Sequence, residues 1–283
     1  MKHLKKIVSL INQLDKRPSN KLNYVDQQVI SDVRRITGEP ENSTYVPNDH
    51  RELCNRLFYT SYMGTENSSK ETRQRAKDLA NAIGSYHVDI NIDTVINAIR
   101  DLFALATGLR PKFKVHGGSY SENIALQNIQ ARLRMLLSYL FAQLLPWVRG
   151  KQGGLLVLAS SNVDECLRGY LTKYDCSSAD LNPIGSISKT DLKRFISWAQ
   201  HKFSLSILED FINATPTAEL EPITQNYVQS DEADMGMTYD QLSSFGRLRK
   251  IDKCGPYAMF TKLLIEWKDQ MSPVEVSKIL LKN

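Results

Sequence analysis

Polar side chains that suit phosphate and metal chemistry follow an apolar run, residues 155–159, in the middle of the chain. Ser160 comes directly after the run, and Glu165 lies in the first turns of the helix predicted next. A carboxylate beside a hydroxyl suits Mg²⁺ bound to a polyphosphate, because this ion keeps several waters and takes only one or two protein oxygens. The alternative is structural: Asn162 and Asp164 cap the helix, and Glu165 complements its dipole. The spacing alone leaves both interpretations open.

A lysine at a helix start is the second candidate for phosphate chemistry. Lys189 follows Ser188 at the beginning of another predicted helix, where backbone N–H groups and a cation converge on any bound anion. A lysine in a first turn is mildly unfavourable for the helix dipole, so a functional role would explain it. A solvated side chain explains it equally well.

Two polar side chains share one face of a long helix predicted over residues 122–145. Asn128 and Arg132 are four residues apart and point the same way, whereas Arg134 points elsewhere. An arginine in this position can hold a phosphate or a carboxylate through two parallel N–H groups. An ion pair with Glu122 or with a partner helix is the alternative.

A loop bounded by two prolines, residues 216–222, could also meet a ligand. Thr215 and Thr217 supply two hydroxyls there, and an acidic stretch, residues 230–234, follows the loop. A rigid loop of this kind can contact a ribose or a phosphate, or it can simply connect two helices.

Several familiar catalytic patterns are missing from the sequence. The five histidines do not pair at ligand spacing, and the four cysteines show no C-x-x-C or C-x-x-H spacing. We therefore expect neither a zinc site nor a disulfide framework, and we interpret the cysteines as reduced thiols of a cytoplasmic protein. The paired glycines belong to no G-x-G-x-x-G or Walker motif, which disfavours a dinucleotide-binding dehydrogenase and a Walker-type ATPase.

Strands alternate with helices through the first half of the chain. Strands are expected at residues 56–63, 86–92 and 155–159, and helices at residues 26–36, 68–83, 94–107 and 122–145. Ser68 with Glu71 is typical of a capping box, and Asp93 is the expected cap of the helix that follows it. The alternation predicts an α/β fold with a doubly wound parallel sheet, whose ligands bind at the carboxyl ends of the strands.

The remaining elements are predicted to be helical. An amphipathic helix is expected at residues 4–14, and a helical C-terminal part is expected at residues 189–202, 239–248, 256–269 and 273–282. The last of these has a clear start, because Ser272 is a good cap and Pro273 suits the first helical position.

Composition and charge exclude several classes of protein. The 283 residues are 42% hydrophobic and 24% charged, as in ordinary globular proteins. The net charge of +5 lies within residues 1–21, beyond which the two signs balance, so a general nucleic-acid-binding face is not expected. The longest apolar stretch, residues 135–148, falls short of the roughly 20 residues of a membrane span, and no membrane partner is expected.

Five ordered motifs resemble the synthetase domain of NAD⁺ synthetases, most closely the eukaryotic glutamine-dependent form. They are N-I-Q-A-R-L-R-M at 128–135, S-S-N-V-D-E at 160–165, L-T-K-Y-D-C-S-S-A-D-L-N-P-I-G-S-I-S-K at 171–189, P-T-A-E-L-E-P at 216–222 and D-E-A-D-M-G-M-T-Y at 231–239. The resemblance covers the chain from about residue 25 to its end. It implies an α/β fold of the adenine-nucleotide ATP-pyrophosphatase type.

The resemblance also implies a reaction and its site. The nicotinate carboxylate of deamido-NAD⁺ attacks the α-phosphate of ATP, releasing pyrophosphate, and ammonia then displaces AMP to give NAD⁺. This chemistry needs phosphate charge to be neutralised and uses no protein nucleophile. By motif match, Glu165 binds Mg²⁺, while ATP is contacted by Ser160, Lys189 and Thr217. Deamido-NAD⁺ is held by Asn128, Arg132, Lys173 and Asp180.

Three parts of the family pattern lie outside these 283 residues: a Ser-Gly-Gly-x-Asp-Ser loop, a C-terminal His-Lys pair, and an N-terminal nitrilase-like glutaminase domain that supplies ammonia. The resemblance therefore predicts an NAD⁺ synthetase domain over residues 1–283 that is truncated at both ends. It also implies a homo-oligomer. The alternative is a non-catalytic paralogue or interaction subunit that binds nucleotide weakly or associates with the full-length enzyme.

Overall fold

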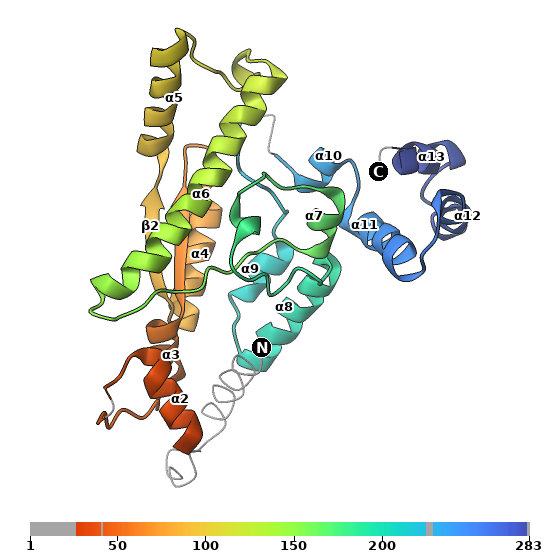
Figure 1. The fold of residues 1–283 in the computed structure, drawn as a ribbon. Coiled ribbons are helices and arrows are strands. Elements are labelled where there is room, and N and C mark those ends of the chain that lie inside the picture. Colours follow the sequence, from red (N-terminus) through yellow and green to blue (C-terminus); the bar gives the residue numbers. More distant parts are fainter. Residues whose placement is uncertain (1–26, 41, 225–228, 282–283) are drawn as a thin grey trace.

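The computed structural model describes residues 27–40, 42–224 and 229–281, so the helix predicted at residues 4–14 lies outside the described residues. The elements that follow one another along the chain are α2 (Gln27–Thr37), α3 (His50–Leu57), β1 (Tyr59–Gly64), α4 (Lys70–Ile83), β2 (Tyr86–Asn91), α5 (Asp93–Thr107), η2 (Lys114–His116), α6 (Tyr120–Val148), α7 (Val163–Arg168), η3 (Cys176–Ser178), α8 (Lys189–Phe203), α9 (Leu208–Asn213), α10 (Asp231–Met235), α11 (Tyr239–Gly246), η4 (Arg247–Ile251), α12 (Pro256–Glu266) and α13 (Pro273–Leu281). Helices and a parallel sheet together make this an α/β fold (Figure 1).

The sheet is a parallel pair of strands, β1 and β2, joined by the crossover helix α4. Tyr59 lies opposite Tyr86, and the register continues to Gly64 opposite Asn91. Gly84 ends α4 and turns the chain toward β2. Its φ is 75°, in the left-handed region, and a Cβ atom at this position would lie 2.8 Å from Arg51. A residue with a side chain would be strained and crowded at this position.

Alternating side chains of β1 face two different helices. The hydroxyl of Tyr62 lies 3.0 Å from Oγ1 of Thr72 on α4, so this face of the strand is covered by α4. Met63 points the other way, into a core cluster with Ile92, Ile96 and Leu133 of α6. The sheet therefore lies between α4 and α6, and its carboxyl ends open toward the loops that follow Gly64 and Asn91.

Some predicted boundaries were wrong by a short distance. Residues 56 and 57 belong to α3, which begins at a cap that the sequence did not indicate: Oδ1 of Asp49 accepts the N–H of Arg51 at 2.8 Å. Ser69, rather than Ser68, caps α4 by accepting the N–H of Thr72 at 3.1 Å. Ser68 instead accepts the N–H of Thr65 at 3.1 Å and shapes the preceding turn.

Two further predictions in the first half of the chain were also wrong. Asp93 is the first residue of α5 and makes no cap bond, because its carboxylate accepts the N–H of Glu66 at 3.1 Å. Residues 155–159 form no strand buried on both faces. They make one isolated parallel bridge, Leu158 to Leu181, and Leu156 is 73% exposed. Within the described chain no named strand pairs with this run, and Leu156 and Leu158 stay exposed while Ala159 is buried.

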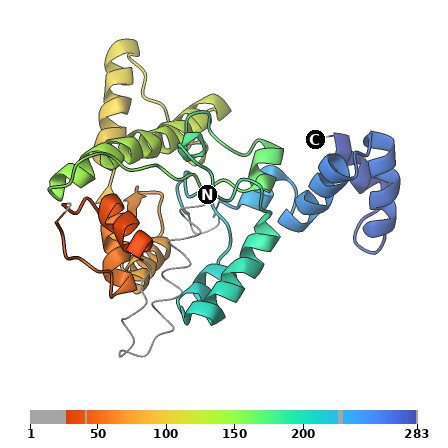
Figure 2. The same cartoon turned by 60° about the horizontal axis from the view of Figure 1, so that its bottom comes forward.

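The C-terminal helices have a core of their own. Residues of α11, α12 and α13 pack around Leu242, Leu263 and Val276, each at most 1% exposed. Figures 1 and 2 both show these three helices grouped at one end of the molecule, away from the sheet. The predicted helical C-terminal part is confirmed, although α11 ends at Gly246 and continues as the π-helical turn η4.

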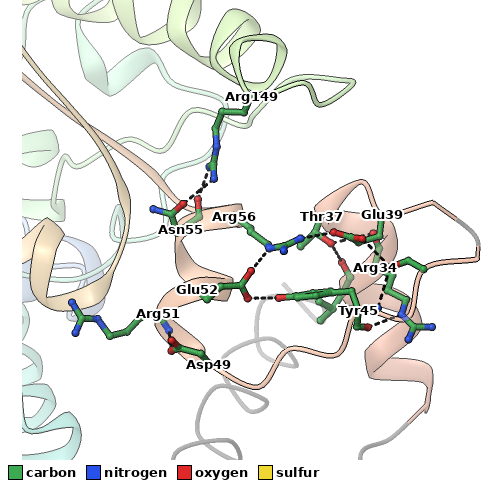
Figure 3. Close-up of polar contacts among 12 residues, drawn as sticks. Arg34, Thr37, Glu39, Tyr45, Asp49, Arg51, Glu52, Asn55, Arg56 and Arg149 are labelled. Atoms are coloured by element: carbon green, nitrogen blue, oxygen red, sulfur yellow. Dashed lines mark hydrogen bonds and ion pairs between the residues drawn. The ribbon is translucent and has the colours of Figure 1, made fainter.

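The opposite corner is held by a polar cluster around Tyr45, shown in Figure 3. The hydroxyl of Tyr45 donates to Oε2 of Glu52 at 2.5 Å, and the guanidinium of Arg56 lies 4.1 Å from the centre of the tyrosine ring. Arg56 also pairs with Glu52 and Glu39. Beyond α6, Arg149 donates to the backbone carbonyl of Asn55 at 2.6 Å, which ties the end of the long helix to α3.

Two global features concern the cysteines and the hydropathy of the helices. Cys54, Cys166, Cys176 and Cys254 are all free. Among the described residues, no helix is both long enough and apolar enough to cross a bilayer.

Candidate functional site

Glu165 has two sets of contacts. It is the third residue of α7 and completes a capping box: Asn162 accepts its N–H at 3.0 Å, and its Oε2 accepts the N–H of Asn162 at 3.1 Å. The capping role predicted for Asn162 is therefore confirmed, whereas that of Asp164 was wrong, because its carboxylate accepts the N–H of Lys189 on α8. The other carboxylate oxygen of Glu165, Oε1, accepts Nδ2 of Asn162 at 2.7 Å and also lies near Lys189 and Tyr239.

Lys189 and Glu165 form an ion pair. Nζ of Lys189 lies 3.7 Å from Oε1 of Glu165, and the two side chains are 27% and 17% exposed. The first residue of α8 is held in place by α7, because Oδ2 of Asp164 accepts the N–H of Lys189 at 2.8 Å. Burial raises the pKa of Glu165, and the charge of Lys189 opposes that rise. Two candidates with separate predicted roles thus form one charged pair that solvent can reach.

Asp231 and Tyr239 complete this pair, and sequence reasoning assigned neither a role. The hydroxyl of Tyr239 lies 2.9 Å from Oδ2 of Asp231 and 3.3 Å from Oε1 of Glu165. Nζ of Lys189 lies 5.1 Å from the centre of its ring. Asp231, 7% exposed, has its pKa raised by burial. The only signal in the sequence was that both residues belong to one quoted motif, 231–239.

A second group of candidates lies between α6 and the segment 171–181. Oδ1 of Asn128 accepts the hydroxyl of Thr172 at 2.8 Å, and Nε of Arg132 donates to the carbonyl of Lys173 at 2.9 Å. The prediction that Asn128 and Arg132 share one face is confirmed. Arg134 points elsewhere, as expected, and donates to the carbonyl of Met63 at the end of β1.

The alternative partner of Arg132 is occupied elsewhere. Glu122 completes the capping box of α6 with Ser119, and the described residues contain no ion pair of Arg132. The exposed guanidinium of Arg132 keeps terminal N–H groups available for a ligand. On the same side of α6, Asp180 accepts the hydroxyl of Tyr139 at 3.2 Å.

Thr217 lies in a loop that is fixed to the carboxyl end of β1. The carbonyl of Leu220 accepts Nε2 of Gln130 at 2.8 Å, and Oε1 of the same glutamine accepts the hydroxyl of Thr65 at 3.1 Å. Thr217 itself accepts the N–H of Glu219 at 3.3 Å. The loop therefore borders the strand end where the sequence predicts ligand binding. A backbone bond at 3.3 Å, from Asp231 to the carbonyl at position 216, connects it to the carboxylates described above.

Ser160 is exposed and follows the bridge at Leu158, on the chain segment that leads into α7. The structure places it five residues before Glu165, at the entrance to the capping box. In the described part of the chain its hydroxyl makes no hydrogen bond to Thr217 or Lys189, so its candidacy still rests on the sequence motif.

The donor set fits a phosphate-bound magnesium ion better than a metal site built from protein alone. Among the described residues, no group of three or more His, Cys, Asp or Glu could hold a metal. Mg²⁺ usually keeps its waters and takes one or two carboxylates together with substrate phosphates. A partly exposed carboxylate at Glu165 beside the ammonium of Lys189 has the composition that such a shared site needs.

Comparison with known proteins gives consistent matches. A family model described as NAD synthase matches residues 50–254. The chain is 66% identical over 253 residues to the "Putative glutamine-dependent NAD(+) synthetase" of Schizosaccharomyces pombe, and 63% identical over 255 residues to the "Glutamine-dependent NAD(+) synthetase" of Saccharomyces cerevisiae. Each match covers 89% of this chain but only 36% and 35% of the relative. The chain thus spans about a third of the length of these relatives.

A solved structure supports the fold. The glutamine-dependent NAD(+) synthetase of Cytophaga hutchinsonii superposes with a TM-score of 0.62 over 82% of this chain and 33% of that one. The two share 22% sequence identity, so this match shows a common fold.

Proposed function

The chain belongs to the NAD synthase family, and from this premise we propose that its site binds ATP and deamido-NAD⁺ for the ATP-dependent amidation that yields NAD⁺. The observation that carries the proposal is the Lys189–Glu165 pair, which lies near the strand-end loop of Thr217 and offers one cation and one anion to a polyphosphate. Family membership favours this function over a non-catalytic role.

The proposed reaction has two balanced steps. A carboxylate oxygen of deamido-NAD⁺ bonds to the α-phosphorus of ATP as the bond to pyrophosphate breaks. Ammonia then bonds to the acyl carbon, loses a proton, and expels AMP together with that oxygen. Lys189 would neutralise the negative charge that builds up on the departing pyrophosphate. Ser160 and Thr217 would contact ATP.

The dinucleotide would lie along the exposed side of α6. Arg132 would hold a carboxylate or phosphate through its free N–H groups, with Asn128, Lys173 and Asp180 around it. These four residues come from one helix face and one adjoining segment, so they can hold one ligand in a fixed orientation. Orientation matters here because the attacking carboxylate must line up with the α-phosphorus.

The metal would be held by Glu165. When bound, Mg²⁺ would supply positive charge to the phosphate oxygens of ATP and so favour departure of pyrophosphate. The carboxylate would exchange its contact with Lys189 for the ion, which frees the ammonium to meet a phosphate.

Binding to a chimera tests the function and the role of Glu165 together. The chimera carries this chain in place of the matching third of the Saccharomyces cerevisiae relative, and calorimetry is expected to show binding of Mg-ATP and of deamido-NAD⁺. Glu165→Gln should raise the Mg²⁺ concentration needed for half-maximal ATP binding roughly 10- to 100-fold, the cost of one charge-assisted contact. Affinity for deamido-NAD⁺ should stay unchanged. Absence of binding by the chimera, with binding by the parent relative, would refute the proposal.

We also propose the source of ammonia and the location of the protein. The relatives are glutamine-dependent by name, and this chain matches about a third of them, so glutamine hydrolysis would belong to the part of those proteins that the chain does not match. A cytoplasmic location agrees with four free cysteines and with the absence of a spanning helix among the described residues.

Self-association would occur through an apolar face near the end of α5. Leu102 and Leu105 are 65% and 85% exposed and lie three residues apart on one side of this helix, and exposed apolar surface of this kind marks interaction sites. If a second copy of the chain presented the same face, the two apolar faces would cover each other. We expect light scattering to show a dimer that the double variant Leu102→Glu/Leu105→Glu converts to a monomer. Ile251→Glu, at an equally exposed apolar residue on η4, should leave the dimer intact; dissociation by both variants would contradict this assignment.

A further inference from the structure

We infer that Tyr239 is a positioning residue, which anchors the Glu165 carboxylate for its metal role and connects it to the C-terminal helical core. This inference rests on the proposed function, because it assigns a role to a residue that contacts the proposed metal ligand, Glu165. Three observations support it: the placement of the hydroxyl, the placement of the ring, and the burial of the whole side chain.

The hydroxyl of Tyr239 lies between two carboxylates. The hydroxyl has one proton to donate. It donates this proton mainly to Oδ2 of Asp231, which is the nearer acceptor at 2.9 Å. The contact to Oε1 of Glu165 is longer, at 3.3 Å. Nδ2 of Asn162 also donates to this oxygen, at 2.7 Å. Tyr239 is thus fixed firmly at Asp231 and would keep its longer contact to Glu165 when the ion takes the place of Lys189, so that it helps to orient the carboxylate toward the ion.

The ring of Tyr239 supports the other member of the pair. Nζ of Lys189 lies 5.1 Å from the ring centre, within the range of a cation–π interaction. The ring therefore limits where the ammonium can move, while the hydroxyl limits where the carboxylate can turn. The two functions use different atoms of one side chain and can be separated by substitution.

Burial anchors Tyr239 to the C-terminal core. The residue is 5% exposed and belongs to the cluster that contains Leu242, Phe245 and Leu263. It is also the first residue of α11, after the capping box of Thr238. Tyr239 therefore links the packing of α11 to α13 with Glu165 on α7 and Lys189 on α8.

The chain contains a matched arrangement far from the site. At the α2–α3 corner, Tyr45 donates its hydroxyl to a glutamate, Glu52, beneath the guanidinium of Arg56 at 4.1 Å (Figure 3). Removal of either hydroxyl deletes the same chemical group from the same kind of surroundings. Tyr45→Phe is therefore the control for general effects of losing a tyrosine–carboxylate bond.

The test is a magnesium titration of ATP binding in the chimera, followed by calorimetry. Tyr239→Phe should raise the Mg²⁺ concentration at half-maximal ATP binding about five- to tenfold, the effect of one modest hydrogen bond. It should change ATP binding without Mg²⁺ less than about twofold, because the ring under Lys189 remains. Tyr239→Leu removes the ring as well as the hydroxyl, so it should weaken ATP binding both with and without Mg²⁺. A loss of packing alone would not move the magnesium midpoint while sparing metal-free binding.

The outcomes separate the inference from the proposed function. Magnesium-dependent ATP binding by the unsubstituted chimera is the result that the proposed function requires, and its absence would overturn both. If that binding is present and Tyr239→Phe behaves like Tyr45→Phe, only the positioning role is overturned. Should Tyr239→Phe fail to fold, Asp231→Asn serves instead: it weakens the anchor of the tyrosine and should raise the same midpoint about two- to threefold, whereas no change would refute the inference.

Discussion

Replacement of Lys189 by alanine is expected to lower kcat/KM for ATP about 100-fold in the chimera. The ammonium is 27% exposed and lies beside Glu165, so its contact with a phosphate would be charge-assisted and worth up to about 3 kcal/mol. The substitution also leaves the half-buried carboxylate of Glu165 without its cation. Steady-state kinetics with ATP as the varied substrate measure the effect.

Lys193→Ala is the matched control for this loss. Lys193 lies four residues further along the same helix, α8, is exposed, and has no ion pair among the described residues. Its removal should leave kcat/KM within about twofold, as surface substitutions usually do. Equal kinetics for the two alanine variants would remove Lys189 from the phosphate role.

The largest expected loss of stability comes from Leu263→Ala in the C-terminal core. Leu263 on α12 is fully buried, and truncation of such a leucine leaves a cavity that costs about 2–5 kcal/mol of the free energy of unfolding. Urea denaturation of the 283-residue chain, followed by circular dichroism, measures this change.

Ile265→Ala provides the comparison on the same helix. Ile265 is 75% exposed, so its truncation should change the free energy of unfolding by no more than about 0.5 kcal/mol. If both variants lost the same stability, α12 would not be packed as described. A further consequence concerns the site: Leu263 shares its cluster with Tyr239, so its truncation should also weaken the contacts of Glu165.

Local sequence signals predicted the elements well where one helix turn or one strand decides the outcome. The start of α8 behind Ser188 and the start of α13 at Pro273 were predicted at the observed residues, and the strand at 86–92 was displaced by only one residue at its end. Caps and alternation are properties of neighbouring residues, which explains this success. Ser68 and Ser69 could not be distinguished because both can cap a helix.

Features that depend on distant residues were harder to predict. Residues 155–159 have the composition of a buried strand, yet strand formation needs flanking strands that the local pattern cannot supply. The pairing of Glu165 with Lys189 joins residues 24 positions apart, and the contact with Tyr239 spans 74 positions. Spacing can nominate such residues one at a time, but only the fold shows that they meet.

We propose that this chain supports amide formation through an adenylate, and an oxygen-transfer experiment tests this proposal most directly. The chimera is supplied with Mg-ATP, ammonia and deamido-NAD⁺ in which both carboxylate oxygens are ¹⁸O. The ¹⁸O content of the products is then measured by mass spectrometry. We expect one NAD⁺ and one AMP per turnover, with one ¹⁸O in the AMP and none in the pyrophosphate. Unlabelled AMP, ADP in place of AMP, or no NAD⁺ from the chimera while the parent relative makes it, would refute the adenylate route.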